Sequence, residues 1–143
     1  MRLSALPLLF AAALPLAATP AHAAQPIAGN WVTENGHAVV TVAPCGAAHS
    51  TGLCGRVSRI LVAVPGGPAT DRNNPDPRLR GKPVIGMAVL SGFTDAGGDW
   101  RGRIYDPESG KTYKSIVARE AGGLKVQGCV MMFCRTQHWR PAR

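Results

Sequence analysis

Alternating apolar and polar residues predict two short strands early in the chain. Residues 37–44 are mostly β-branched or small, and Val40 and Val42 fall on one face. The run 30–33 precedes them, and residues 34–36 end in the Asn-Gly pair typical of a tight turn. The two runs are therefore expected to pair as an antiparallel hairpin.

Further strands are predicted downstream. Within residues 100–105, Trp100 and Ile104 alternate with arginines, and the Asp-Pro-Glu-Ser-Gly turn at 106–110 leads into a returning strand. In the run 53–62 the alternation slips near Ser58, which indicates a bulge. The predicted ranges are 53–62, 84–93, 100–105, 111–119, 124–129 and 134–139.

Eight strands with short connections, and no helical segment of any length, predict an all-β fold. An open sheet of this size would leave two unpaired edges, and closure into an up-and-down barrel removes both. We therefore expect an eight-stranded antiparallel up-and-down barrel, with a two-sheet sandwich as the alternative.

Residues 1–23 have the three parts of a signal peptide: a positive start at Arg2, an apolar run at 3–18 and an Ala-x-Ala end. The apolar run is shorter than the ~20 residues that span a bilayer, which disfavours an uncleaved anchor. No later transmembrane segment is expected. Cleavage would leave a single domain at 24–143, in the periplasm or secreted.

Four cysteines follow the predicted cleavage site, and an even number in an oxidising compartment indicates disulfides. Pairing neighbours requires the least reorganisation, which predicts Cys45 with Cys54 and Cys129 with Cys134. A zinc site is the alternative, because the spacing of Cys129 and Cys134 fits a zinc knuckle. Its other ligands would come from His37, His49 or His138.

The formal net charge is +8 at pH 7, which favours an anionic surface of the cell envelope as a neighbour. The basic residues are scattered and form no aromatic-studded stripe of the kind that stacks on bases. Nucleic-acid binding is therefore not expected.

One long connection, residues 65–82, is rich in side-chain oxygens. It resembles a calcium loop, but Asp76 stands where the central glycine belongs and Lys82 where the bidentate acid belongs. Turns formed by Asp, Asn and Pro account for its composition instead.

Several blocks carry a resemblance to a known family. They are residues 29–31, 45–55, 70–80, 102–113, 124–129 and 136–139. Together they make the chain similar to DUF2147, a family of small exported bacterial proteins of unassigned function. The resemblance implies a lipocalin-like barrel of the calycin kind, and it implies no reaction.

Lipocalin-like barrels carry Gly-x-Trp on the first strand and a basic residue late in the chain. Residues 29–31 match the first feature. By this resemblance, an arginine would stack on Trp31 and close the narrow end of the barrel. Arg140 is the candidate, with Arg143 as the alternative, because Arg140 directly follows Trp139 and would point to the opposite face.

No constellation of catalytic residues is found. No serine stands in a Gly-x-Ser-x-Gly elbow, and the histidines are too dispersed for a triad or a metal centre. Asp106 and Glu108 could form an acid–base pair, but the turn that contains them explains both. We expect no enzyme activity, metal or cofactor.

Residues 130–133 predict an apolar hairpin tip between two cysteines. A tip is normally polar because water covers it, so this one needs cover from the barrel mouth, a ligand, a partner or a membrane. Packing back onto the protein's own core is the alternative. The tip residues are Val130, Met131, Met132 and Phe133.

A barrel of this kind predicts noncatalytic binding of a small apolar or amphipathic ligand in the cell envelope. Alternation selects the candidate lining residues Val40, Met87, Val89, Ile104, Tyr113 and Val117. Two alternatives remain: a partner-binding envelope module whose barrel is filled by its own side chains, and a hydrolase using Asp106 and Glu108.

Overall fold

The computed structural model describes residues 22–46, 52–63, 65 and 69–143. Most of the predicted signal peptide (residues 1–21) and His49 lie outside the described residues. Within the described part of the chain, no helix is both long and apolar enough to cross a membrane.

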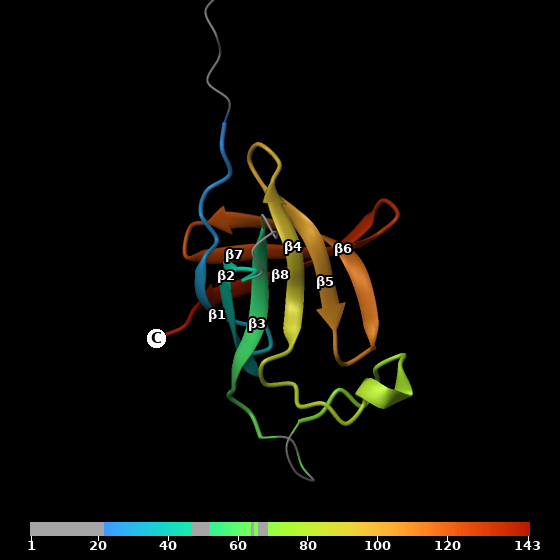
Figure 1. Cartoon of the computed structure of the whole chain (residues 1–143). Coiled ribbons are helices and arrows are strands. Elements are labelled where there is room, and N and C mark those ends of the chain that lie inside the picture. Colours follow the sequence, from blue (N-terminus) through green and yellow to red (C-terminus); the bar gives the residue numbers. More distant parts are fainter. Residues whose placement is uncertain (1–21, 47–51, 64, 66–68) are drawn as a thin grey trace, which may run out of the picture.

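Eight antiparallel strands, joined in sequence order, curve into a closed barrel (Figure 1). The first strand pairs with the last, so the predicted all-β barrel is confirmed and the sandwich alternative is wrong. A short 3-10 turn, η1 (Pro77–Leu79), lies between the third and fourth strands. The strands are β1 (Gly29–Val32), β2 (Ala38–Pro44), β3 (Leu53–Ile60), β4 (Ala88–Asp95), β5 (Trp100–Asp106), β6 (Lys111–Glu120), β7 (Gly123–Val130) and β8 (Phe133–Pro141).

The predicted bulge is present in β3. Val39 pairs with Arg59 and Val40 pairs with Val57, which leaves Ser58 without an opposite residue on β2. An extra residue of this kind increases the local twist, which helps a sheet to curve.

The fourth strand begins later than the apolar run at 84–93 predicts. Residues 84–87 form a turn in which the amide of Met87 donates to the carbonyl oxygen of Val84 (3.1 Å). Gly86 has a φ of +85°, outside the range of a strand. Apolar composition alone extended the predicted strand across this turn.

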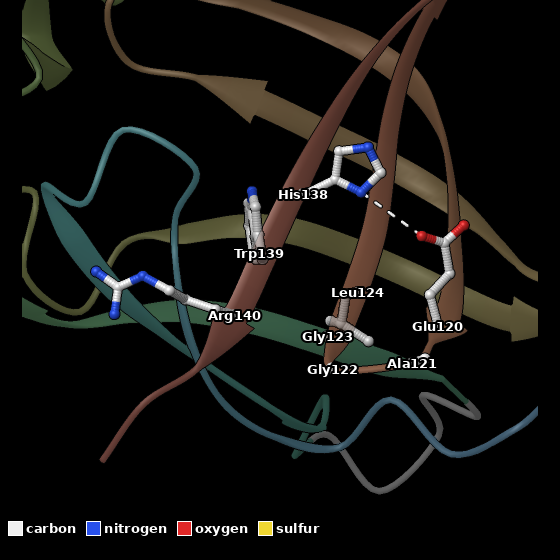
Figure 2. A pocket seen from close by; sticks show the side chains of 8 residues that line it. All are labelled: Glu120, Ala121, Gly122, Gly123, Leu124, His138, Trp139 and Arg140. Atoms are coloured by element: carbon white, nitrogen blue, oxygen red, sulfur yellow. Dashed lines mark ion pairs between the residues drawn. The ribbon is translucent and has the colours of Figure 1, made fainter.

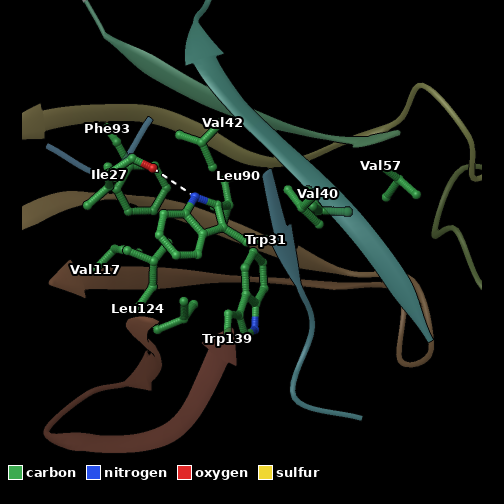
Figure 3. Packing of buried hydrophobic residues seen from close by; sticks show 12 residues of the cluster. Ile27, Trp31, Val40, Val42, Val57, Leu90, Phe93, Val117, Leu124 and Trp139 are labelled. Atoms are coloured by element: carbon green, nitrogen blue, oxygen red, sulfur yellow. Dashed lines mark hydrogen bonds between the residues drawn. The ribbon is translucent and has the colours of Figure 1, made fainter. Parts of the chain in front are cut away.

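One end of the barrel is packed with its own side chains (Figure 3). The Nε1 of Trp31 donates to the carbonyl oxygen of Ile27 (2.9 Å), so the segment before β1 folds beneath this end. A Cβ at Gly102 would lie 2.6 Å from Cδ2 of Phe93, so glycine lets this ring fill the space. The residues buried here include Ile27, Trp31, Phe93, Val117 and Leu124.

Both predicted disulfides are present. The S–S distance is 2.04 Å between Cys45 and Cys54 and 2.01 Å between Cys129 and Cys134. Cys129 and Cys134 are directly opposite residues of β7 and β8. The zinc alternative is therefore wrong, because disulfides occupy all four thiol groups.

Candidate functional site

The other end of the barrel contains a cavity of about 610 Å³. Because successive strands alternate in direction, four connections surround its mouth: β1–β2, β3–β4, β5–β6 and β7–β8. Its volume lies within the roughly 300–1,000 Å³ of small-molecule sites. The deep wall is apolar and includes Val40, Val57, Val89, Ile104, Val126 and Trp139.

Four of the six candidate lining residues lie on this cavity: Val40, Val89, Ile104 and Tyr113. The placement of Val117 on the cavity wall is wrong, because this fully buried side chain belongs to the packed end. Met87 is also absent from the lining, because it lies in the turn before β4 and packs against the core.

The β3–β4 connection is fastened to β5 beside the cavity mouth. The hydroxyl of Tyr105 donates to Oδ1 of Asp71 (2.7 Å), and Nδ2 of Asn74 donates to Oδ2 (2.6 Å). Asp71 is only 3% exposed, so these two hydrogen bonds replace those that water would donate to its carboxylate. Burial, together with the bond to Asp71, raises the pKa of Tyr105 to about 12. Tyr105 is therefore a hydrogen-bond donor throughout the physiological pH range.

A second contact fastens the same connection to the β5–β6 turn. Nδ2 of Asn73 donates to the carbonyl oxygen of Glu108 (2.7 Å). Gly110 has a φ of +69°, and a Cβ there would collide with the carbonyl oxygen of Asn73. The Asp, Asn and Gly residues here thus stabilise turns and loop contacts, as the composition of residues 65–82 predicts.

The rim of the cavity carries charges of both signs. Arg72 and Arg135 lie on it together with Glu34, Asp106 and Glu108. The oxygens of Asp106 accept from the amide of Glu108 (2.9 Å) and the hydroxyl of Ser109 (2.7 Å), so this carboxylate stabilises its own turn. The rim can therefore receive the polar end of an amphipathic molecule whose apolar part lies deeper.

Arg119, not Arg140, stacks on Trp31. The guanidinium carbon of Arg119 lies 4.7 Å from the ring centroid. Arg119 on β6 is in register with the inward-facing Leu124, whereas Arg140 follows the buried Trp139 and points outward. The assignment of Arg140 as the barrel-closing residue is therefore wrong, and the alternative Arg143 does not take this place either.

A smaller pocket of about 130 Å³ lies on the outer surface beside the β6–β7 turn (Figure 2). Oε2 of Glu120 and Nδ1 of His138 are 3.5 Å apart there, and both side chains are exposed. Ion pairs so open to solvent contribute little energy. The interior cavity is the better candidate site, because it is larger and its deep wall is apolar.

Comparison with protein families matches residues 29–140 to DUF2147, described as an uncharacterized protein conserved in bacteria. This chain belongs to the DUF2147 family. A search of curated proteins finds no match for the DUF2147 chain.

Among solved structures, the DUF2147 chain is similar to HP1028 of Helicobacter pylori, described as belonging to the lipocalin family. The TM-score is 0.68 at 20% sequence identity, over 82% of this chain and 84% of the other. At that identity, the likeness of the DUF2147 barrel to HP1028 is one of fold.

Sequence reasoning missed several residues of the DUF2147 cavity. Val57, Val126 and Trp139 line it, as does Gly128, which leaves space between Ile104 and Tyr113. Alternation along β7 was a usable signal for Val126. No local pattern could have shown that a glycine on the same strand leaves room in the barrel.

Proposed function

We propose that the protein is a noncatalytic binding protein of the cell envelope for a small apolar or amphipathic molecule. The cavity carries this proposal: its size suits such a ligand, its deep wall is apolar and its charges gather at the rim. The general ligand-binding character of lipocalin-like folds supports it by analogy.

Substitution of Gly128 tests the proposal. A Cβ at this position would make only ordinary contacts, 3.5 Å from Cγ2 of Ile104 and 3.8 Å from Cβ of Tyr113, so the barrel tolerates a side chain. The larger side chain of Gly128→Leu would occupy the cavity. We expect it to weaken binding of a dansyl-labelled fatty acid, followed by fluorescence, by about tenfold or more.

Two controls make the result specific. Gly128→Ala should reduce binding less than Gly128→Leu, because it fills less of the cavity. Gln127→Leu alters the neighbouring outward-facing position and should leave binding unchanged. If the wild-type protein fails to bind apolar probes, or if Gly128→Leu binds as well as wild type while remaining folded, the proposal is wrong.

A further inference from the structure

The exposed apolar side chains gather at one end of the molecule. Within the described ranges, all large exposed hydrophobic residues lie in or next to the β3–β4 and β7–β8 connections, at the mouth. The β7–β8 tip contributes the four most exposed, at 57% for Val130, 94% for Met131, 86% for Met132 and 78% for Phe133. The predicted apolar tip is therefore not packed onto the core.

The tip is built in a way that keeps these side chains exposed. Met131 and Met132 form a two-residue turn between the paired residues Val130 and Phe133. Met131 has a φ of +54°, a conformation that favours glycine or asparagine in such turns. The disulfide between Cys129 and Cys134 then cross-links the strands directly behind the tip. The positive φ disfavours methionine at this turn position, and so does exposure to water. The presence of methionine here points to an apolar environment outside the protein.

Basic side chains lie beside the tip on the outer face. Arg103 on β5 and Lys114 on β6 are directly opposite each other, and Lys114 is in turn opposite Cys129. Both are exposed, and among the described residues neither makes an ion pair. Like charges at opposite positions of a sheet destabilise it. An anionic surface would attract both side chains and offset their mutual repulsion.

We propose that the β7–β8 tip inserts into an anionic lipid bilayer, with Arg103 and Lys114 contacting lipid headgroups. Stable binding to such surfaces takes two signals, such as a buried apolar group and a basic patch; the tip supplies the first, and Arg103 and Lys114 supply the second. A protein partner fits less well, because stable interfaces bury about 800 Å² on each side and a two-residue turn is too narrow for that.

Insertion would also turn the cavity mouth toward the bilayer. Val130 belongs to the tip and lines the cavity, so the apolar wall of the cavity continues into the tip. If the proposed function is correct, an apolar ligand could pass between membrane and cavity without crossing much water. The insertion itself does not depend on the presence of a ligand.

Flotation with lipid vesicles tests the insertion. Purified protein should bind vesicles of equimolar phosphatidylglycerol and phosphatidylcholine more strongly than vesicles of phosphatidylcholine alone. The double variant Met131→Ser, Met132→Ser should lose about tenfold or more in affinity for the mixed vesicles. The double variant Arg103→Gln, Lys114→Gln should lose about tenfold for the mixed vesicles only.

Matched controls lie elsewhere on the barrel. Ala121→Ser changes the two-residue turn at the other end, and Arg140→Gln removes an exposed charge from the end of β8 that lies far from the tip. Both should bind vesicles like wild type.

The insertion would be overturned by tip variants that bind vesicles like wild type, or by a wild-type protein that binds none. Dimerisation without lipid that the Met131→Ser, Met132→Ser change abolishes would also overturn it, because a second copy would then cover the tip. Binding of the dansyl-labelled fatty acid in vesicle-free solution should survive in the tip variants, which separates this proposal from that for the cavity.

A separate observation concerns the new amino terminus that signal-peptide cleavage would create. The backbone nitrogen of Ala24 lies 3.1 Å and 3.0 Å from the two carboxylate oxygens of Asp95. The next residues are also held, since Nε1 of Trp100 donates to the carbonyl oxygen of Gln25 (2.9 Å). We infer that cleavage after Ala23 places the freed ammonium group of Ala24 in an ion pair with Asp95.

Sequencing of the exported protein from its amino terminus should begin at Ala24. Asp95→Asn should lower the Tm of the chain that begins at Ala24 more than that of a chain that retains Ala23, in which the ammonium is displaced by one residue. A different first residue, or equal losses of Tm in the two chains, would refute the ion pair.

Discussion

Arg119 and Trp31 stack at the packed end of the barrel. The cation over the indole face is attracted by the ring quadrupole, while the Nε1 of the same ring is satisfied by Ile27. The stack therefore joins β6, β1 and the segment before β1 through one aromatic side chain. It holds the packed end in place without taking part in the cavity.

Arg119→Gln should lower the free energy of unfolding by about 1 kcal/mol, because it removes the cation but retains much of the side-chain length. Arg140→Gln, on the neighbouring outward face, should have a smaller effect. Urea denaturation of the two variants measures the difference, and equal losses would show that the stack contributes nothing.

Ser115 is a buried polar residue with an unusual environment. It is 2% exposed, and its hydroxyl has no hydrogen-bond partner among the residues that the structure describes. Ser115→Ala should therefore raise the free energy of unfolding by about 1 kcal/mol, because a buried unsatisfied hydroxyl is removed. Thermal unfolding measures this, and a marked loss of stability would indicate that the hydroxyl has a partner in solution.

The β3–β4 connection is long, yet it is held at defined points. Tyr105 and Asn74 bond to Asp71, and Asn73 bonds to the β5–β6 turn. At the start of η1, the Asp76 carboxylate accepts from the side chain and amide of Arg78, and these bonds lower the pKa of Asp76. These contacts hold residues 71–78 of the connection at the border of the cavity mouth.

Tyr105→Phe should loosen this border by removing one of two donors to a buried carboxylate, at a cost of about 1–3 kcal/mol. Because the pKa of Tyr105 is raised from 10.0 to about 12, its contribution is complete below pH 10 and is lost as the pH rises toward 12. Urea denaturation at a series of alkaline pH values should show this loss in wild type and a smaller one in Tyr105→Phe. Equal pH dependence in both proteins would contradict the assignment.

The strands and their order could be predicted from alternation and turn residues, because each signal is local. The extent of the cavity could not. Val117 and Val126 are directly opposite each other and both face inward, yet only Val126 lines the cavity. The difference arises because Phe93 and Ile27 fill one end, and this depends on contacts between distant strands. Arg119 was missed as the residue that stacks on Trp31 for the same reason.

The ring is closed by a short seam. Trp31 is opposite Pro141, and Val32 is opposite Arg140. The amide of Ala142 donates to the backbone carbonyl oxygen of Asn30 (2.9 Å). The pairing of β6 with β7 is much longer. The seam is therefore the weakest of the strand pairings that make the barrel.

Deleting residues 140–143 should lower the free energy of unfolding by about 2–3 kcal/mol, since it removes the hydrogen bonds of the seam and exposes an edge of β1. Arg140→Ala should have little effect, because it keeps the backbone. Thermal unfolding of both proteins tests this, and an unchanged Tm after the deletion would show that the seam does not hold the ring.

Because β1 can pair with β8 only after β8 has been synthesised, the closed barrel cannot form on a partly synthesised polypeptide. Translation proceeds at about 5–20 residues per second, so the nascent chain stays open for several seconds, with the partner of its first strand still on the ribosome. During that interval the chain can still be threaded through a narrow channel. Once β8 emerges from the ribosome, the barrel closes and this interval ends.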